Sequence, residues 1–390
     1  MRAVLVCAVV ALQSAELNGS FALLTRTAAW IVAPAAMIAL FGLGGFSLAR
    51  SIDRNGARTA LGRMAWRLVP AIAVIVVASA LVVGAVITQQ RPGLYFSDPE
   101  TWLYLLNIAG IPQFSLPGLF VNNDVSGVVN ANVWIIPLAY GLAATIFGAS
   151  LRPARMTVLL LGAAALAAAL GIALQSDLLA VPYARMLTRI WTGPALNVTV
   201  GFLAGAAAYH QRARIVIDRR LGALVLAAML GFAAIGDPRL LQSAVAGPLV
   251  ALAAVYVALV ACSLALPLRH AAKPLEPLLW RILLLSYPVQ QFWSEVGSGR
   301  QSAALNLAVS APTVVLLAWV QWVLIERPLL LRLGGDVGAI GGILSLPDAR
   351  KLKNRMARTV PGLLAATVIV ACALVAVALA VFALQRDPAN

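Results

Sequence analysis

The sequence predicts an all-α polytopic membrane protein with about eleven transmembrane helices. Of its 390 residues, 62% are hydrophobic and only 11% are charged, and the mean hydropathy is +0.91. A soluble domain carries charge on about a quarter of its residues. Runs of about 20 apolar residues, enough to span a bilayer, recur along the chain. The expected spans are Ala3–Leu17, Ala28–Ala49, Trp66–Ile87, Asn132–Ser150, Arg155–Leu174, Ile190–His210, Leu221–Gly236, Leu241–Leu266, Pro277–Val296, Leu305–Ile325 and Val360–Leu384.

The distribution of basic residues predicts the orientation of these spans. When they are threaded alternately from a cytoplasmic N-terminus, 22 of the 29 Lys and Arg residues fall on the cytoplasmic side and 7 on the other. This bias follows the positive-inside rule and places the C-terminus outside the cytoplasm. It also explains the net charge of +15, so the lipid bilayer is the expected partner and nucleic acid is not.

The chain is expected to form one membrane domain with an addition at its end. Residues 1–330 form the transmembrane domain, 331–358 a cytoplasmic loop and 359–390 an additional C-terminal transmembrane helix. The first segment has a second interpretation, because Met-Arg before a short apolar run resembles a signal peptide. We favour a short first helix, since no small-x-small cleavage site follows Leu12 and the threading needs this span.

One stretch, Ile111 to Tyr140, does not have the pattern of a plain span. Its prolines Pro112, Pro117 and Pro137 fix backbone dihedrals and remove hydrogen-bond donors. Shaped backbone of this kind is tolerated at a membrane only where protein or water satisfies it. Just before it, Pro99 to Asn107 has the aromatic and leucine content of a short interfacial helix.

Six local strings resemble the membrane-bound acyltransferase 3 family and occur in the order that this family has them. They are Phe41-Gly-Leu-Gly-Gly-Phe-Ser-Leu-Ala-Arg50, Arg63-Met-Ala-Trp-Arg67-Leu-Val-Pro70, Asn130-Ala-Asn-Val-Trp134-Ile-Ile-Pro137, Phe202-Leu-Ala-Gly205, Tyr287-Pro-Val-Gln-Gln291 and Ile325-Glu-Arg-Pro328. The resemblance implies ten or eleven spans in the bacterial inner (plasma) membrane. It also implies transfer of an acyl group, which we expect to be acetyl, from cytoplasmic acyl-CoA to a hydroxyl of an extracytoplasmic glycan or lipid-linked acceptor.

Arginines at the cytoplasmic end of the third span are the expected acyl-CoA site. The guanidinium groups of Arg58, Arg63 and Arg67 suit phosphate oxygens, although positive-inside topology alone also explains basic residues there. On the acceptor side, the resemblance places Asn130, Asn132 and Trp134. Trp134 has the alternative of anchoring its helix at the membrane interface, and the packing of close helices is the favoured role for Gly42, Gly44 and Gly45.

The residues expected to carry the chemistry depart from the family. The resemblance implies a histidine base late in the first span, but Gln13 stands there and glutamine cannot act as a base. Glu16 is one helical turn away and is the alternative base, or else a solvated carboxylate at the helix end. Ala139 and Ser286 stand where the family has an acidic residue and a second histidine.

Two alternatives to an active enzyme stay open. The first is a catalytically inactive homologue that binds a donor, a glycan or a partner in envelope polysaccharide modification. The second is a solute transporter, which is disfavoured because the spans contain few ionisable groups, mainly Arg281 and Glu295. No metal is expected, since the histidines lack ligand spacing and the cysteines resemble small buried hydrophobic residues. Glu326 lies next to Arg327 and Pro328 on the expected cytoplasmic side, where a structural ion pair is expected.

Overall fold

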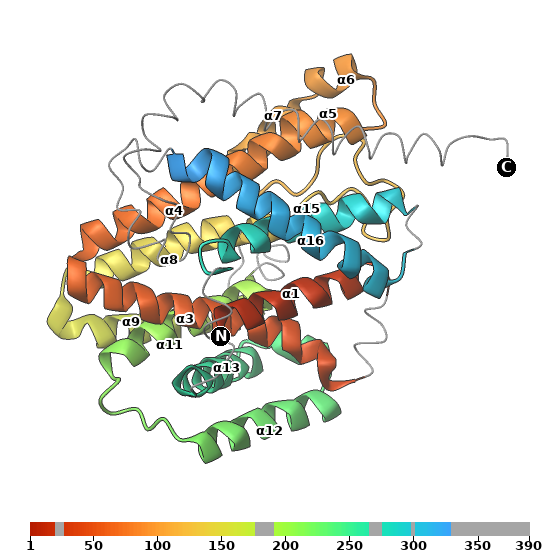
Figure 1. Ribbon diagram of the computed structural model, residues 1–390. Coiled ribbons are helices and arrows are strands. Elements are labelled where there is room, and N and C mark those ends of the chain that lie inside the picture. Colours follow the sequence, from red (N-terminus) through yellow and green to blue (C-terminus); the bar gives the residue numbers. More distant parts are fainter. Residues whose placement is uncertain (20–26, 176–190, 265–274, 298–300, 329–390) are drawn as a thin grey trace, which may run out of the picture. The chain divides into compact units, whose positions relative to one another are not determined.

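The computed structural model describes residues 1–19, 27–175, 191–264, 275–297 and 301–328, and within these ranges it contains helices and no strand (Figure 1). The chain divides into two compact units. Unit 1 comprises Met1–Ala65 and Trp134–His270, and unit 2 comprises Trp66–Val133 and Ala271–Asn390. Each unit is described by itself.

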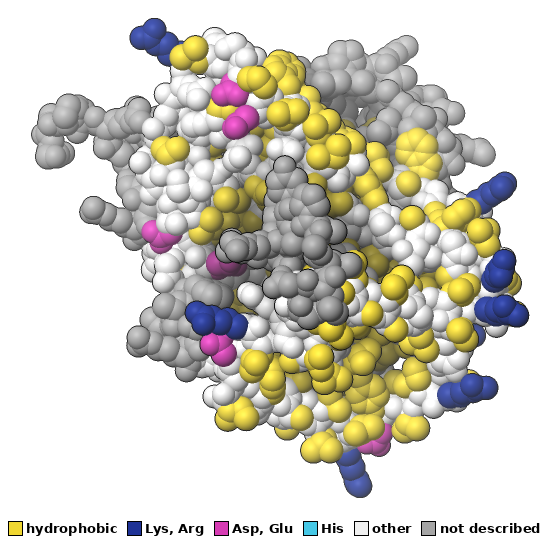
Figure 2. All heavy atoms as spheres, turned by 180° about the vertical axis from the view of Figure 1, so that it is seen from behind, with side chains coloured by type: hydrophobic (Ala, Val, Ile, Leu, Met, Phe, Trp, Pro, Cys, Tyr) yellow, Lys and Arg dark blue, Asp and Glu magenta, His cyan; other side chains and the backbone are white. Residues whose placement is uncertain are grey.

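The described helices fit the predicted membrane architecture. Each of the ten expected spans in these ranges contains a helix. Among the described residues, six helical stretches are long and apolar enough to cross a bilayer: Ala28–Asn55, Ala57–Ile87, Ala131–Ser150, Pro153–Gln175, Ala246–Ser263 and Ala303–Glu326. Figure 2 shows apolar side chains exposed between scattered charged groups. The all-α membrane class is therefore confirmed, while the total of eleven spans and their orientation stay predictions.

The structure does not describe two parts of the predicted domain organisation. The loop at 331–358 and the helix at 359–390 lie outside the described residues.

Unit 1 is built on two long helices that run side by side, α3 (Val32–Asn55) and α11 (Leu196–His210) (Figure 1). Packed around them are α1 (Arg2–Leu17), the 3-10 helix η1 (Ala28–Ile31), α8 (Ile135–Ser150), η5 (Pro153–Arg155), α9 (Met156–Gln175), η6 (Trp191–Ala195), α12 (Arg219–Ile235), η7 (Pro238–Gln242) and α13 (Ala246–Ser263).

Glycines bring α3 and α11 into close contact. A Cβ atom added to Gly42 would lie 2.5 Å from a methyl group of Val255 and 3.2 Å from the carbonyl oxygen of Gly201. One added to Gly205 would overlap the carbonyl group of Gly42, and one added to Gly45 would overlap the carbonyl oxygen of Phe202. Gly44 differs, because its nearest neighbour would lie 4.0 Å away on the Phe202 ring. Without a hydrophobic driving force in lipid, such small-residue contacts are a main source of helix association. The predicted packing role is therefore confirmed for Gly42 and Gly45 but not for Gly44.

Long-range hydrogen bonds fasten the outer helices of unit 1. Trp30 Nε1 donates to the carbonyl oxygen of Ala233 at 2.9 Å, Arg2 donates to that of Leu43 at 2.8 Å, and Asn197 donates to that of Leu241 at 2.8 Å. Each donor meets a carbonyl that lipid could not satisfy.

The cysteine prediction is wrong for the two cysteines that the structure describes. Cys7 and Cys262 are exposed, because an apolar residue of a membrane helix can face lipid as well as the protein core.

Unit 2 contains the shaped segment and the last described helices. The helix α4 (Ala57–Val77) starts in unit 1 and continues into unit 2. It is followed by the π-helix η2 (Ala78–Val83), α5 (Gly84–Ile87), α6 (Pro92–Ser97), α7 (Pro99–Leu103), the 3-10 helices η3 (Tyr104–Ala109) and η4 (Ala131–Trp134), α15 (Leu279–Val296), α16 (Ala303–Gln321) and the π-helix η9 (Trp322–Glu326). The pair α15 and α16 lie side by side (Figure 1).

The predicted short helix near Pro99 is present as α7 and η3. The Asp98 side chain caps α7 by accepting the Glu100 N–H at 2.9 Å. Nearby, the buried Tyr95 hydroxyl donates to the Ala80 carbonyl in the π-helix η2 at 2.6 Å. Burial raises the pKa of Tyr95 to about 12, so this phenol keeps its proton and remains a donor.

Candidate functional site

The candidate site in unit 2 surrounds a proline that interrupts the hydrogen bonding of helix α15. Pro288 lies in α15 and has no N–H, so the carbonyl of Leu284 loses its usual i to i−4 donor. Asn130 replaces that donor, because its Nδ2 lies 3.0 Å from the Leu284 oxygen. Asn132 Nδ2 donates to the adjacent Leu283 oxygen at 2.6 Å. Two asparagines of the shaped segment thus satisfy the backbone around a proline break.

A second set of bonds joins the same segment to α15 about two turns further on, at Gln291. Asn123 Nδ2 donates to the backbone oxygen and to the side-chain oxygen of Gln291, at 2.9 and 2.7 Å. The Gln291 amide in turn donates to the carbonyls of Val125 and Val128, both at 2.8 Å. Because Asn123 and Gln291 are buried, each bond replaces one that water would otherwise have to make.

The backbone of the segment is tightly turned. Ser115 and Val128 form an isolated antiparallel bridge, and the Val129 N–H donates to the Phe114 carbonyl at 2.7 Å. Between them Phe120 has a φ of 51°, in the left-handed region that non-glycine residues rarely occupy. Its side chain is only 1% exposed. Burial of the ring stabilises a backbone conformation that is unfavourable by itself.

Unit 2 also has a polar interior along α15 and α16. Ser286, Gln290 and Ser294 are spaced four residues apart and lie on one face of α15, and Asn306 and Ser310 lie on α16. All five are fully buried, and Asn306 Nδ2 donates to the Gln290 carbonyl at 3.0 Å. Buried polar groups in spans either hold helices together or mark functional sites.

At the end of α16, a buried ion pair joins η9 to α15. Arg281 Nε donates to Glu326 Oε1 at 2.6 Å, and a second guanidinium nitrogen of Arg281 contacts Glu326 Oε2. Gln321 donates both to Glu326 Oε1 at 2.9 Å and to the Ala71 carbonyl at 3.0 Å. The Arg281 guanidinium also lies 4.6 Å from the ring centre of Trp322. Glu326 therefore forms an ion pair as expected, but its partner is Arg281, 45 positions away in the sequence, and not the neighbouring Arg327.

The residues expected at catalytic positions differ in their burial and in the unit to which they belong. On α1, Gln13 is buried and Glu16 is exposed. Ala139 is buried in α8, also in unit 1. Ser286 belongs to unit 2, where its hydroxyl donates to the Leu283 carbonyl at 2.9 Å and lies 3.4 Å from Asn132 Nδ2. The base role of Glu16 stays a prediction.

The expected binding residues separate into exposed and buried groups. Arg58, Arg63 and Arg67 are all exposed on α4, and Arg63 and Arg67 share one face at a spacing of four residues. Asn130 and Asn132, expected on the acceptor side, are buried and their amides bind backbone carbonyls of α15. Trp134 is half-buried at the end of η4.

The chain matches no family model, no curated protein and no solved structure. The resemblance to the acyltransferase 3 family therefore rests on the quoted strings alone.

Two features of this site were not anticipated from the sequence. The Asn123–Gln291 bonds and the Arg281–Glu326 pair each join residues far apart in the chain. The sequence did indicate that partners were needed. Pro288 inside an expected span leaves a carbonyl that needs a hydrogen-bond donor from another segment, and Arg281 in the same span needs an anion. The sequence alone does not identify which residue supplies the donor or the anion.

Proposed function

We propose that this protein is a membrane-bound acyltransferase that moves an acyl group, preferably acetyl, from cytoplasmic acyl-CoA to a hydroxyl of an extracytoplasmic glycan or lipid-linked acceptor. One observation supports this most. The Asn130–Pro137 and Tyr287–Gln291 strings each resemble the acyltransferase 3 family, and the first residue of one lies beside the start of the other. Asn130 Nδ2 donates to the carbonyl of Leu284, which lies three residues before Tyr287 and 154 positions from Asn130. Strings that resemble a family only by chance have no reason to meet.

The donor would bind at the exposed arginines of α4. Arg63 and Arg67 extend from one helix face and can present two guanidinium forks to the phosphates of acyl-CoA. Arg58 is exposed less than two turns earlier on the same helix. The base would be Glu16, because Gln13 has no titratable group.

Labelled acetyl-CoA supplied to inside-out vesicles tests this function. The wild-type protein is expected to transfer label to a glycan in the vesicle lumen. Arg63→Gln and Arg67→Gln, made singly, should each weaken donor binding by roughly 10- to 100-fold, since a hydrogen bond to a charged group contributes about 1.5–3 kcal/mol. Arg152→Gln is the matched control, because Arg152 is also exposed but lies in the turn between α8 and η5, away from the α4 sequence, and it should leave transfer unchanged.

The second candidate is an inactive homologue that binds the donor without transferring the acyl group. It is favoured by Gln13 and Ser286, which are both buried where the family has histidines. Glu16→Gln separates the two candidates. Loss of transfer with retained acetyl-CoA binding supports the enzyme, whereas wild-type protein that binds acetyl-CoA but labels no glycan supports the inactive homologue.

A further inference from the structure

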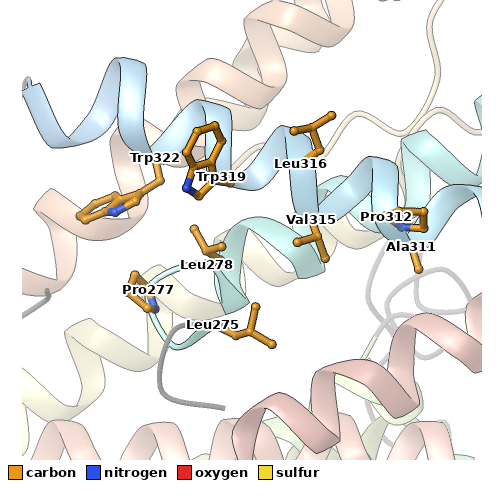
Figure 3. Close-up of a pocket in the computed structure, with 9 residues that line it drawn as sticks. All are labelled: Leu275, Pro277, Leu278, Ala311, Pro312, Val315, Leu316, Trp319 and Trp322. Carbon is orange, nitrogen blue, oxygen red and sulfur yellow. The ribbon is translucent and has the colours of Figure 1, made fainter. Parts of the chain in front are cut away.

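An apolar groove of about 670 Å³ lies in unit 2 between α16 and the turn that leads into α15. Figure 3 shows Leu278 facing Trp319 across it, with Pro277 and Trp322 at one end and Pro312 at the other. Its volume is in the range of about 300–1,000 Å³ that ligand sites occupy.

The surroundings of the groove decide what can fill it. Val315 and Trp319 line the groove and are 39% and 44% exposed, and both lie in the candidate span Ala303–Glu326. Within a bilayer this wall meets hydrocarbon rather than water. An empty groove would forfeit dispersion contacts along its walls, and water would find few polar partners among these side chains. Hydrocarbon is the occupant that these walls favour.

The length of the groove matches one lipid chain. From Pro312 to Trp322 the helix rises about 15 Å at 1.5 Å per residue. This is half of the hydrocarbon thickness of about 30 Å, which is the depth of one leaflet.

The charges beside the groove indicate the headgroup. Arg281, which lies against the ring of Trp322, is neutralised by its ion pair with Glu326. The next cation is Arg327, the first residue after η9, and no carboxylate among the described residues pairs with it. A basic residue at the end of a span attracts anionic headgroups, and an exposed tryptophan such as Trp319 is typical of the interfacial level.

We propose that this groove is a binding site for one acyl chain of an anionic phospholipid, whose headgroup lies at Arg327. The lipid is a bound component of the protein and is distinct from the acyl donor of the proposed reaction. Binding of this lipid does not depend on whether the protein transfers acyl groups.

Photo-crosslinking in vesicles of equal parts phosphatidylglycerol and phosphatidylcholine tests the proposal. A photoreactive amino acid at Val315 should capture phosphatidylglycerol in excess over its share of the vesicle. The same probe at Leu305, which is exposed on α16 but does not line the groove, should capture both lipids in the vesicle ratio. Arg327→Gln should return capture at Val315 to that ratio.

Native mass spectrometry of the unlabelled full chain gives a second measurement that needs no probe. The wild type should retain phosphatidylglycerol after detergent exchange. Retention should be lost in Ala311→Phe, which fills the groove, and kept in Ala304→Phe, which places the same side chain at an exposed position of α16 outside it. The proposal is overturned by capture of a second copy or of the chain's own residues at Val315, by the vesicle ratio at both probes, or by equal retention in the two variants.

Discussion

Removal of the Asn130 amide tests the central structural element of unit 2. In Asn130→Ala, the Leu284 carbonyl loses its donor at 3.0 Å and Pro288 cannot supply another. An unsatisfied buried carbonyl costs about 1–3 kcal/mol, and we expect a loss of that size in the free energy of unfolding. The loss should appear as an earlier transition in a detergent denaturation series followed by tryptophan fluorescence.

A double-mutant cycle isolates the cause of this loss. Pro288→Ala restores an N–H that can donate to Leu284, so Asn130→Ala should cost less in that background, with a coupling energy of about 0.5–3 kcal/mol. Asn130 Oδ1 also accepts the Asn132 N–H at 2.9 Å, but this loss is the same in both backgrounds and cancels. Asn122→Ala is the control, because Asn122 is exposed and its amide lies 3.4 Å from Glu295. An equal cost of Asn130→Ala in both backgrounds would refute the reasoning.

Three further predictions concern other parts of the fold. Gly205→Ala should destabilise unit 1 by about 1–3 kcal/mol through overpacking, whereas Gly44→Ala, which has room for its methyl group, should be neutral or stabilising in the same assay. Glu326→Leu alone should lower the free energy of unfolding by about 3–5 kcal/mol, because it leaves Arg281 buried without its anion. The double variant Arg281→Leu, Glu326→Leu should recover most of this loss. Equal losses in the single and double variants would show that the two residues are not coupled. The free energy of unfolding should fall as pH rises from about 10 towards 12, because tyrosine in the unfolded chain ionises near pH 10 while folded Tyr95, with a pKa of about 12, keeps its proton. In Tyr95→Phe the free energy of unfolding should fall less steeply over this pH range. An unchanged slope in that variant would contradict the prediction.

Local chemistry made much of the helical architecture predictable from the sequence. Apolar runs of membrane length located the ten expected spans in which the structure has helices. The prolines Pro112 and Pro117 correctly marked a segment of shaped backbone. These features depend on residues near one another in the chain, which a sequence displays directly.

Long-range pairing set the limit of prediction. The demand for a donor at Pro288 was visible, but the choice of Asn130 depends on a loop that returns to α15 from 154 positions away. Gly44 and Gly45 are neighbours in the sequence, yet only Gly45 faces α11 closely, because the helix rotation decides which glycine is at the contact. The exposure of Cys7 likewise depends on which helix face meets lipid.

For the candidate site, residue type alone did not determine the surroundings. Asn130 and Asn132 suit acceptor binding by their chemistry, but both are buried with their amides bound to backbone carbonyls. Arg58 and Arg63 were expected at a helix entrance and are exposed there. A binding role is more readily carried by groups that a ligand can reach.

The most direct test of the proposed function is the transfer of labelled acetyl from acetyl-CoA on the cytoplasmic face of sealed vesicles to a glycan on the opposite face. With wild-type protein, we predict labelled glycan, and with Glu16→Gln we predict none at equal protein content. Label that stays in acetyl-CoA with the wild type, across a panel of envelope glycans, would contradict the proposal.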